Sequence, residues 1–78
     1  MMEILVLELL TDEKVSYRYY PECGEKYGIV SLMRKTSERI HDKPCLDTIS
    51  SYAGQAWRRL EEYQARNYFP EKGTVAWW

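Results

Sequence analysis

The sequence predicts an α+β domain in which a twisted antiparallel sheet of four to five strands carries one long helix on one face. Two hydrophobic periods predict it. Apolar residues alternate with polar ones in the segments before Pro44, which is typical of strands with one buried face. After Pro44 the period becomes 3.6, which is typical of a helix, and an apolar segment then closes the sequence. Because 78 residues suit one hydrophobic core, we expect residues 1–78 to form a single domain.

Turn-forming residues separate the expected strands. Pro21 lacks a backbone N–H donor, and Gly24 and Gly28 permit positive φ, so residues 21–28 are expected to form a loop between antiparallel strands. A short fourth strand ends before Pro44. The last strand is expected to return and pair with an earlier one. The expected strands cover residues 3–10, 15–20, 29–34, 39–41 and 74–78.

One amphipathic helix is expected over residues 48–66. Asp47 suits its N-cap because a carboxylate accepts from the free N–H groups of the first turn, and Asn67 and Pro70 mark its end. The apolar stripe consists of Ile49, Tyr52, Ala53, Ala56, Trp57, Leu60 and Tyr63. The opposite face carries i,i+4 ion pairs, Arg58–Glu62 and Glu62–Arg66, which need no function to explain them.

Charge and hydropathy disfavour several classes of function. The chain has 11 Lys and Arg against 12 Asp and Glu, a net charge of −1, so an extended positive surface for nucleic acid or an anionic membrane is not expected. The apolar run from Ile4 to Leu10 is short and interrupted by Glu8, unlike a membrane span or a signal peptide. We therefore expect a cytoplasmic protein. Its 14% of aromatic residues excludes intrinsic disorder.

Two cysteines and one histidine are the candidate ligands and nucleophiles. Cys23 and Cys45 are too few for a disulfide framework, so reduced thiols are expected. His41 and Cys45, with Cys23 as a third group, allow a metal site or a thiol nucleophile with a His base as alternatives. A structural zinc site normally has four such ligands in two close pairs, however. A surface His and a semi-buried Cys are the simpler interpretation.

Other catalytic patterns are weak. Gly24 and Gly28 do not lie between a strand and a helix, so they do not form a phosphate-binding loop. The neighbouring carboxylates are explained as solvated or capping groups. We therefore expect neither an enzyme nor a bound cofactor.

Four segments together resemble a known pattern. They are YRYYPE at 17–22, GIVSL at 28–32, YAGQA at 52–56 and FPEKGTVAWW at 69–78. As a set they resemble a family of small uncharacterised bacterial proteins, some of them phage-associated, with a YYPE loop, a GIV strand, a YAG-type helix and a closing FPEEG-VAW strand. The resemblance covers most of the chain except residues 36–45. It implies a complete unit and assigns no activity, cofactor or site residue.

Aromatic residues supply the candidate binding site. Tyr20 points away from the face shared by its neighbours in the same strand, and it is expected near Tyr27 and one of the terminal tryptophans. Trp77 and Trp78 are adjacent in a strand and must point to opposite faces. One can pack under the helix, and the other is left for the open face of the sheet. The candidate binding residues are Arg18, Tyr20, Tyr27, Trp77 and Trp78.

This composition favours a non-enzymatic interaction domain. Tyr, Trp and Arg are enriched in interface hot spots, so the uncovered sheet face or an edge strand is expected to bind a protein partner or a second copy of the chain. One alternative is a second small core of long side chains folded over the sheet. Another is single-stranded nucleic-acid binding by the same aromatic and Arg residues, which the near-zero net charge disfavours.

Overall fold

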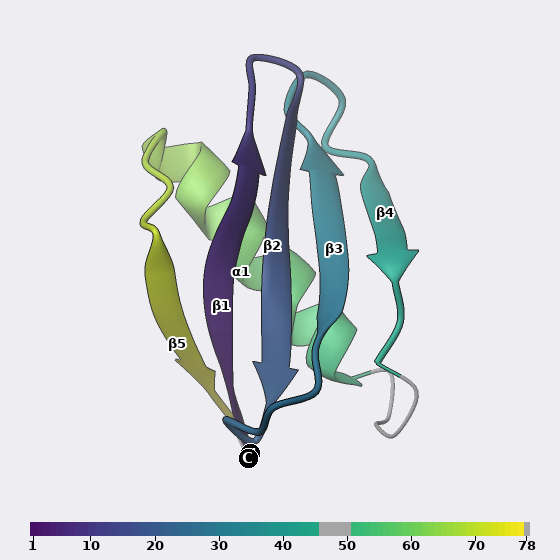
Figure 1. Ribbon diagram of the computed structural model, residues 1–78. Coiled ribbons are helices and arrows are strands. Elements are labelled where there is room, and N and C mark those ends of the chain that lie inside the picture. Colours follow the sequence, from purple (N-terminus) through teal and green to yellow (C-terminus); the bar gives the residue numbers. More distant parts are fainter. Residues whose placement is uncertain (46–50, 78) are drawn as a thin grey trace.

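The computed structural model describes residues 1–45 and 51–77 (Figure 1). Its elements are β1 (Met2–Leu10), β2 (Lys14–Pro21), β3 (Gly28–Met33), β4 (Arg39–Lys43), α1 (Ser51–Arg66) and β5 (Lys72–Ala76). The strands form one antiparallel sheet in the order β4-β3-β2-β1-β5. The helix α1 lies across one face of this sheet (Figure 1). The predicted α+β architecture, with one helix on an antiparallel sheet, is confirmed.

The last strand pairs with the first. The N-terminal ammonium of Met1 donates to the carbonyl of Trp77 at 2.7 Å, and the amide of Trp77 donates to the carbonyl of Met1 at 2.8 Å. This pairing places β1 between β2 and β5 and leaves β4 and β5 as the two outer strands. The sequence had left this strand order open, because several earlier strands offered an edge for the last one.

The core lies between α1 and the face of the sheet that it covers. Alternate sheet residues supply one side and the stripe of α1 supplies the other. Ala53 and Ala56 keep the helix surface shallow where it faces the sheet, which leaves room for large tyrosine rings. The buried apolar residues include Leu5, Val15, Tyr17, Tyr19, Val30, Leu32, Tyr52, Ala53, Ala56, Leu60, Tyr63 and Val75. Trp57 of the predicted stripe packs only partly against this cluster.

Glycine has a different role in the β2–β3 loop from the one predicted. No glycine among the described residues has a positive φ; Glu22 and Cys23 adopt the left-handed conformation instead, at φ 52° and 59°. Gly28 is required for space, because a Cβ there would overlap the Tyr19 ring. Open space lies beside Gly54. The structure thus needs glycine where a tyrosine crosses the backbone, not where the loop turns.

Several element boundaries differ from the expected ones. Pro21 is the last residue of β2, and β5 begins two residues earlier than expected. The helix ends at Arg66, and Asn67 follows in the left-handed conformation at φ 53°, as its C-terminal position predicts. Glu62 pairs with Arg59 at i,i+3, with Nε and Oε2 3.0 Å apart, where i,i+4 pairs with Arg58 and Arg66 were expected.

Three predicted roles lie outside the described residues. They are the N-cap Asp47, the stripe residue Ile49 and the terminal Trp78. In the described part of the chain, no helix combines the length and apolar character needed to cross a membrane.

Candidate functional site

The candidate site occupies the uncovered face, the face of the sheet opposite α1. Because Leu5 and Tyr19 are buried beneath the helix, their chain neighbours Ile4, Arg18 and Tyr20 point to the other side. Ile4 lies opposite Tyr20 in the β1–β2 register. The uncovered face therefore brings half-buried apolar side chains beside an arginine and a tyrosine.

An aromatic and cationic cluster forms around Tyr27. The Tyr20 and Tyr27 ring centroids are 5.3 Å apart, and the Arg18 Cζ atom lies 4.9 Å from the centroid of the Tyr27 ring. The Nζ atom of Lys43, from β4, lies 4.1 Å from the same centroid. Arg18, Tyr20, Tyr27, Glu8 and Lys43 are called the Arg18 cluster below.

Arg18 is held in place by Glu8 from β1. Its Nε donates to Glu8 Oε2 at 2.5 Å and its Nη2 to Oε1 at 3.3 Å, which is a bidentate pair. Its Nη1 also donates to the Tyr20 hydroxyl at 3.4 Å. The hydrogen bonds to Glu8 and then Tyr20 raise the Arg18 pKa, so the guanidinium stays charged. These bonds place the guanidinium between the Glu8 carboxylate and the Tyr20 hydroxyl.

A small apolar hollow adjoins the Arg18 cluster at Tyr20. Its volume is about 210 Å³, and it is lined by Ile4, Val6, Tyr20, Gly24 and Lys72. Pockets for drug-sized ligands are typically about 300–1,000 Å³. The hollow therefore suits one or two side chains of another protein better than a small-molecule substrate.

The other half of the uncovered face is closed by its own side chains. The Ser16 and Ser31 hydroxyls are 2.7 Å apart, Ser31 donates to Asp42 Oδ2, and Lys14 Nζ donates to Asp42 Oδ1 at 3.3 Å. Ser31 is 0% exposed, so it cannot reach a substrate as a nucleophile. This half is therefore occupied by hydrogen-bonded polar side chains. The alternative of a second small core of long side chains stays a prediction.

The structure brings His41 close to Cys45 but does not group the two with Cys23. His41 Nε2 and the backbone amide of Cys45 both contact the Tyr19 hydroxyl, at 2.8 and 3.2 Å. Cys23 is exposed in the β2–β3 loop, and the two cysteines are not disulfide-bonded to each other. Across residues 1–45 and 51–77, no three His, Cys, Asp or Glu side chains are grouped to hold a metal ion. Tyr19, which the sequence places in a strand, explains the closeness of His41 and Cys45.

Trp77 lies away from the other candidate residues. Its ring packs edge-on against Tyr52 of α1, with centroids 5.3 Å apart, and is half-buried at the rim of the core. The structure thus brings Arg18, Tyr20 and Tyr27 together and places Trp77 on the helix side of the sheet. The sequence pattern did not single out Glu8 or Lys43, because their contacts depend on the strand register.

Glu3 is a buried carboxyl group on the covered face. It is 0% exposed, and neither of its carboxyl oxygens has a hydrogen-bond partner among the described residues. Desolvation by burial raises the pKa of Glu3 from 4.5 to about 8. Its parity with Leu5 along β1 is the sequence signal that could have predicted this burial.

The Glu22 carboxylate, unlike that of Glu3, is hydrogen-bonded. Its Oε2 accepts from the Tyr52 hydroxyl at 2.6 Å and from the Met2 amide at 3.1 Å, and these bonds lower the Glu22 pKa. Glu22 thus connects the β2–β3 loop to α1 and β1. It is already occupied within the chain, so it contributes to the fold and not to the candidate site.

Comparison with protein-family models, with curated proteins and with solved structures finds no match. The resemblance to small bacterial proteins stays a prediction. Any functional proposal therefore depends on the geometry of residues 1–45 and 51–77.

Proposed function

We propose that this protein is a non-enzymatic interaction domain that binds a protein partner through the Arg18 cluster and the neighbouring hollow. The partner would place a large apolar side chain in the hollow, with a carboxylate beside it. The observation that carries this proposal is an open apolar hollow next to a prearranged pair of tyrosines and an arginine. Aromatic and Arg side chains around a pocket are typical of interface hot spots.

The charges at the rim support an acidic partner. Arg18 is compensated by Glu8 and Lys14 by Asp42. Lys43 and Lys72, in contrast, have no ion-pair partner among the described residues, and they border the Tyr27 ring and the hollow. A partner carboxylate next to the apolar side chain in the hollow would lie near a lysine on either side of Tyr20. This charge complementarity would fix the docking register and raise the association rate.

Single-stranded nucleic acid fits this surface less well. Base stacking needs an open ring face, and the ring of Tyr27 is already contacted by Arg18 and Lys43. Two uncompensated lysines give too little positive charge to follow a phosphate backbone. A salt titration distinguishes the two ligands, because oligonucleotide binding would weaken steeply with salt.

The test uses two matched tyrosine substitutions. Tagged wild type, Tyr20→Ala and Tyr68→Ala would each be used for affinity purification from the source cells, with recovered proteins then titrated as purified components. Tyr68 is 67% exposed and lies just after α1, so its substitution controls for loss of an exposed aromatic ring. We expect a partner that binds wild type and Tyr68→Ala equally and binds Tyr20→Ala at least about tenfold more weakly.

Three outcomes would contradict the proposal. One is that every recovered protein binds Tyr20→Ala as tightly as wild type. Another is salt-sensitive binding of a single-stranded oligonucleotide that depends on Tyr20. The third is self-association of the wild type in sedimentation that Tyr20→Ala abolishes, because the occupant would then be a second copy.

A further inference from the structure

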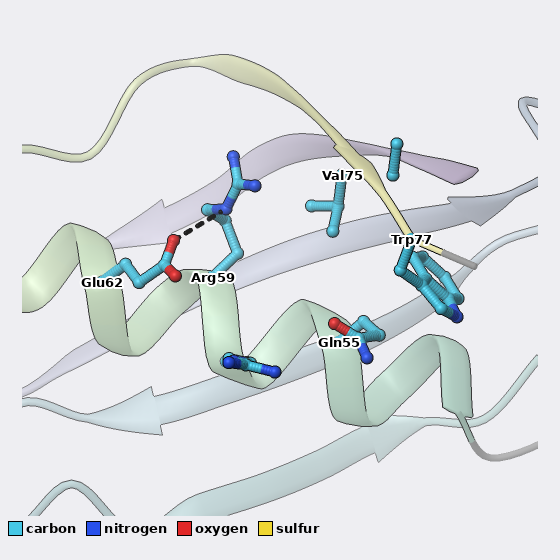
Figure 2. A pocket seen from close by; sticks show the side chains of 7 residues that line it. Gln55, Arg59, Glu62, Val75 and Trp77 are labelled. Carbon is cyan, nitrogen blue, oxygen red and sulfur yellow. Dashed lines mark ion pairs between the residues drawn. The ribbon is translucent and has the colours of Figure 1, made fainter. Parts of the chain in front are cut away.

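A groove of about 360 Å³ lies between α1 and β5, on the helix side of the sheet. The Val75 side chain points from β5 toward α1 (Figure 2). Trp77 lies at one end of the groove, and Arg59 and Glu62 lie toward the other end. No residue of the Arg18 cluster lines it. The groove is therefore separate from the surface assigned to the partner above.

The backbone groups of Thr74 and Ala76 face the outer edge of β5. The Glu71 carbonyl accepts from Leu7 and the Trp77 amide donates to Met1, so the odd-numbered residues of this segment pair with β1. Backbone groups alternate in direction along an antiparallel strand, so those of Thr74 and Ala76 point outward. In the described part of the chain, β5 has no strand on that side.

The groove and this edge adjoin each other. Arg59 Nη1 donates to the outward carbonyl of Thr74 at 3.4 Å, which shows that a side chain from α1 reaches the edge of β5. Arg59 Nε also lies 3.0 Å from Glu62 Oε2, as the dashed line in Figure 2 marks. A strand added to β5 would therefore lie within reach of the polar side chains of α1.

The charge of the groove selects an anionic occupant. Among the described residues, two guanidinium groups and one carboxylate line it, and Glu62 compensates Arg59. The Arg58 side chain is exposed and has no hydrogen bond or ion pair within residues 1–45 and 51–77. A carboxylate on an added strand would compensate the charge of Arg58.

The opposite edge of the sheet is protected in a way that β5 is not. The β4 sequence RIHDK carries charged side chains, and Pro44 follows it. Charges and proline at an edge discourage the addition of another strand. In β5 only Lys72 is charged, and the remaining residues are small or uncharged. Of the two edges, β5 is thus the one suited to strand addition.

We propose that the β5–α1 groove binds an extended peptide segment with an acidic side chain. The peptide adds to β5 through the outward backbone groups of Thr74 and Ala76, which is recognition by strand addition. Its acidic side chain pairs with Arg58, and Arg59 turns from Thr74 to share the carboxylate. Trp77 bounds one end of the peptide.

The probe is a library of phage-displayed random dodecapeptides selected on immobilised wild-type protein. An enriched peptide is then synthesised with both ends blocked, so that its side chains hold its only carboxylates, and titrated into ¹⁵N-labelled protein. We expect enriched peptides to carry an acidic residue. We also expect the largest amide shifts at Thr74 and Ala76.

Two variants separate the charge from the backbone contribution. Arg58→Gln should weaken binding about tenfold, whereas Arg66→Gln, on the last turn of α1, should leave it unchanged. Ala76→Pro removes an outward amide without removing a bond to β1, so it should abolish binding while the dispersion of the NMR spectrum is retained. If Ala76→Pro unfolds, the Arg58→Gln and Arg66→Gln pair still decides.

The proposal is overturned if the library yields no enriched peptide or only peptides without acidic residues. It is also overturned if the amide shifts fall on Ile4 and Tyr20, since the peptide would then occupy the uncovered face. Loss of partner binding in Tyr20→Ala with normal peptide binding would leave the groove intact, so the two sites fail independently.

Discussion

The two faces of the sheet treat polar side chains differently. On the covered face, tyrosine hydroxyls reach partners from other elements, as when Tyr17 donates to the Pro70 carbonyl at 2.5 Å. On the uncovered face, Arg18 is paired with Glu8 at the edge of solvent. Buried polar groups are strongly destabilising when unpaired, whereas exposed ion pairs contribute little. Substitutions on the covered face should therefore change stability, and those around Tyr20 should change binding.

The strand β1 contains this contrast within itself. Glu3 is buried beneath the helix side of the sheet without a hydrogen-bond partner among the described residues, while Glu8 is exposed and pairs with Arg18. The same residue type is thus unfavourable when ionised on one face and harmless on the other. Ionisation of Glu3 is therefore the change expected to destabilise the covered face most.

The largest expected effect is the pH dependence caused by Glu3. Its folded-state pKa of about 8 lies above the ordinary value of 4.5, so the folded protein binds more protons than the unfolded chain between these pH values. The free energy of unfolding should therefore fall by about 1.4 kcal/mol for each pH unit from pH 4.5 to 8. Urea unfolding of wild type at several pH values in this range measures the slope.

Two substitutions in β1 separate the titration of Glu3 from that of the other ionisable groups. Glu3→Gln should remove most of the slope, because an amide does not ionise. Glu8→Gln should keep the slope and change stability by less than about 1 kcal/mol. A wild-type stability that is constant or rises between pH 5 and 8 would show that Glu3 is not held in an apolar environment.

The next largest effect is expected in the apolar core. Leu60→Ala should lower the free energy of unfolding by about 3 kcal/mol, because Leu60 is fully buried between α1 and the sheet. Ile4→Ala on the uncovered face should lower it by only about 1 kcal/mol, because Ile4 is half-buried. Urea unfolding followed by far-UV circular dichroism compares the two. Equal losses would mean that something covers the uncovered face.

A smaller effect is expected where Tyr19 crosses Gly28. Gly28→Ala should destabilise the fold by about 2 kcal/mol, since the added methyl group overlaps the Tyr19 ring and forces it from its bonds to His41 and Cys45. Thermal unfolding measures the change. A neutral substitution would mean that the Tyr19 ring moves aside without loss.

The smallest effect is expected at Gly54 and has the opposite sign. Open space surrounds the position of its missing Cβ on α1. Gly54→Ala should therefore stabilise the protein by roughly 0.5–1 kcal/mol through helix propensity alone. The same thermal unfolding experiment serves as the measurement. Destabilisation would indicate that another element lies against this part of the helix.

The fold class was predictable because its signals are local. Tyr17 and Tyr19 share one parity, and Ala53, Ala56 and Leu60 share one helical stripe, so both periods are visible without knowing any long-range contact. Strand order was not predictable in the same way. It depends on which strand offers β5 a free edge, and the residues of β1 are mainly apolar on both faces.

The candidate site was predictable only in part. The alternation along β2 places Arg18 and Tyr20 on one face, and the short loop brings Tyr27 near them. The contribution of Glu8 and Lys43 depends on the register with β1 and β4, which a single sequence does not reveal. The side on which Trp77 packs depends on the pairing of β5 with β1.

The most direct measurement is the affinity of the purified partner for Tyr20→Ala relative to Tyr68→Ala, with unfolding free energies determined on the same samples. If the uncovered face binds the partner, Tyr20→Ala loses at least about tenfold in affinity while losing about 1 kcal/mol of stability, and Tyr68→Ala binds like wild type. Equal affinities for the two variants would contradict the assignment of binding to this face.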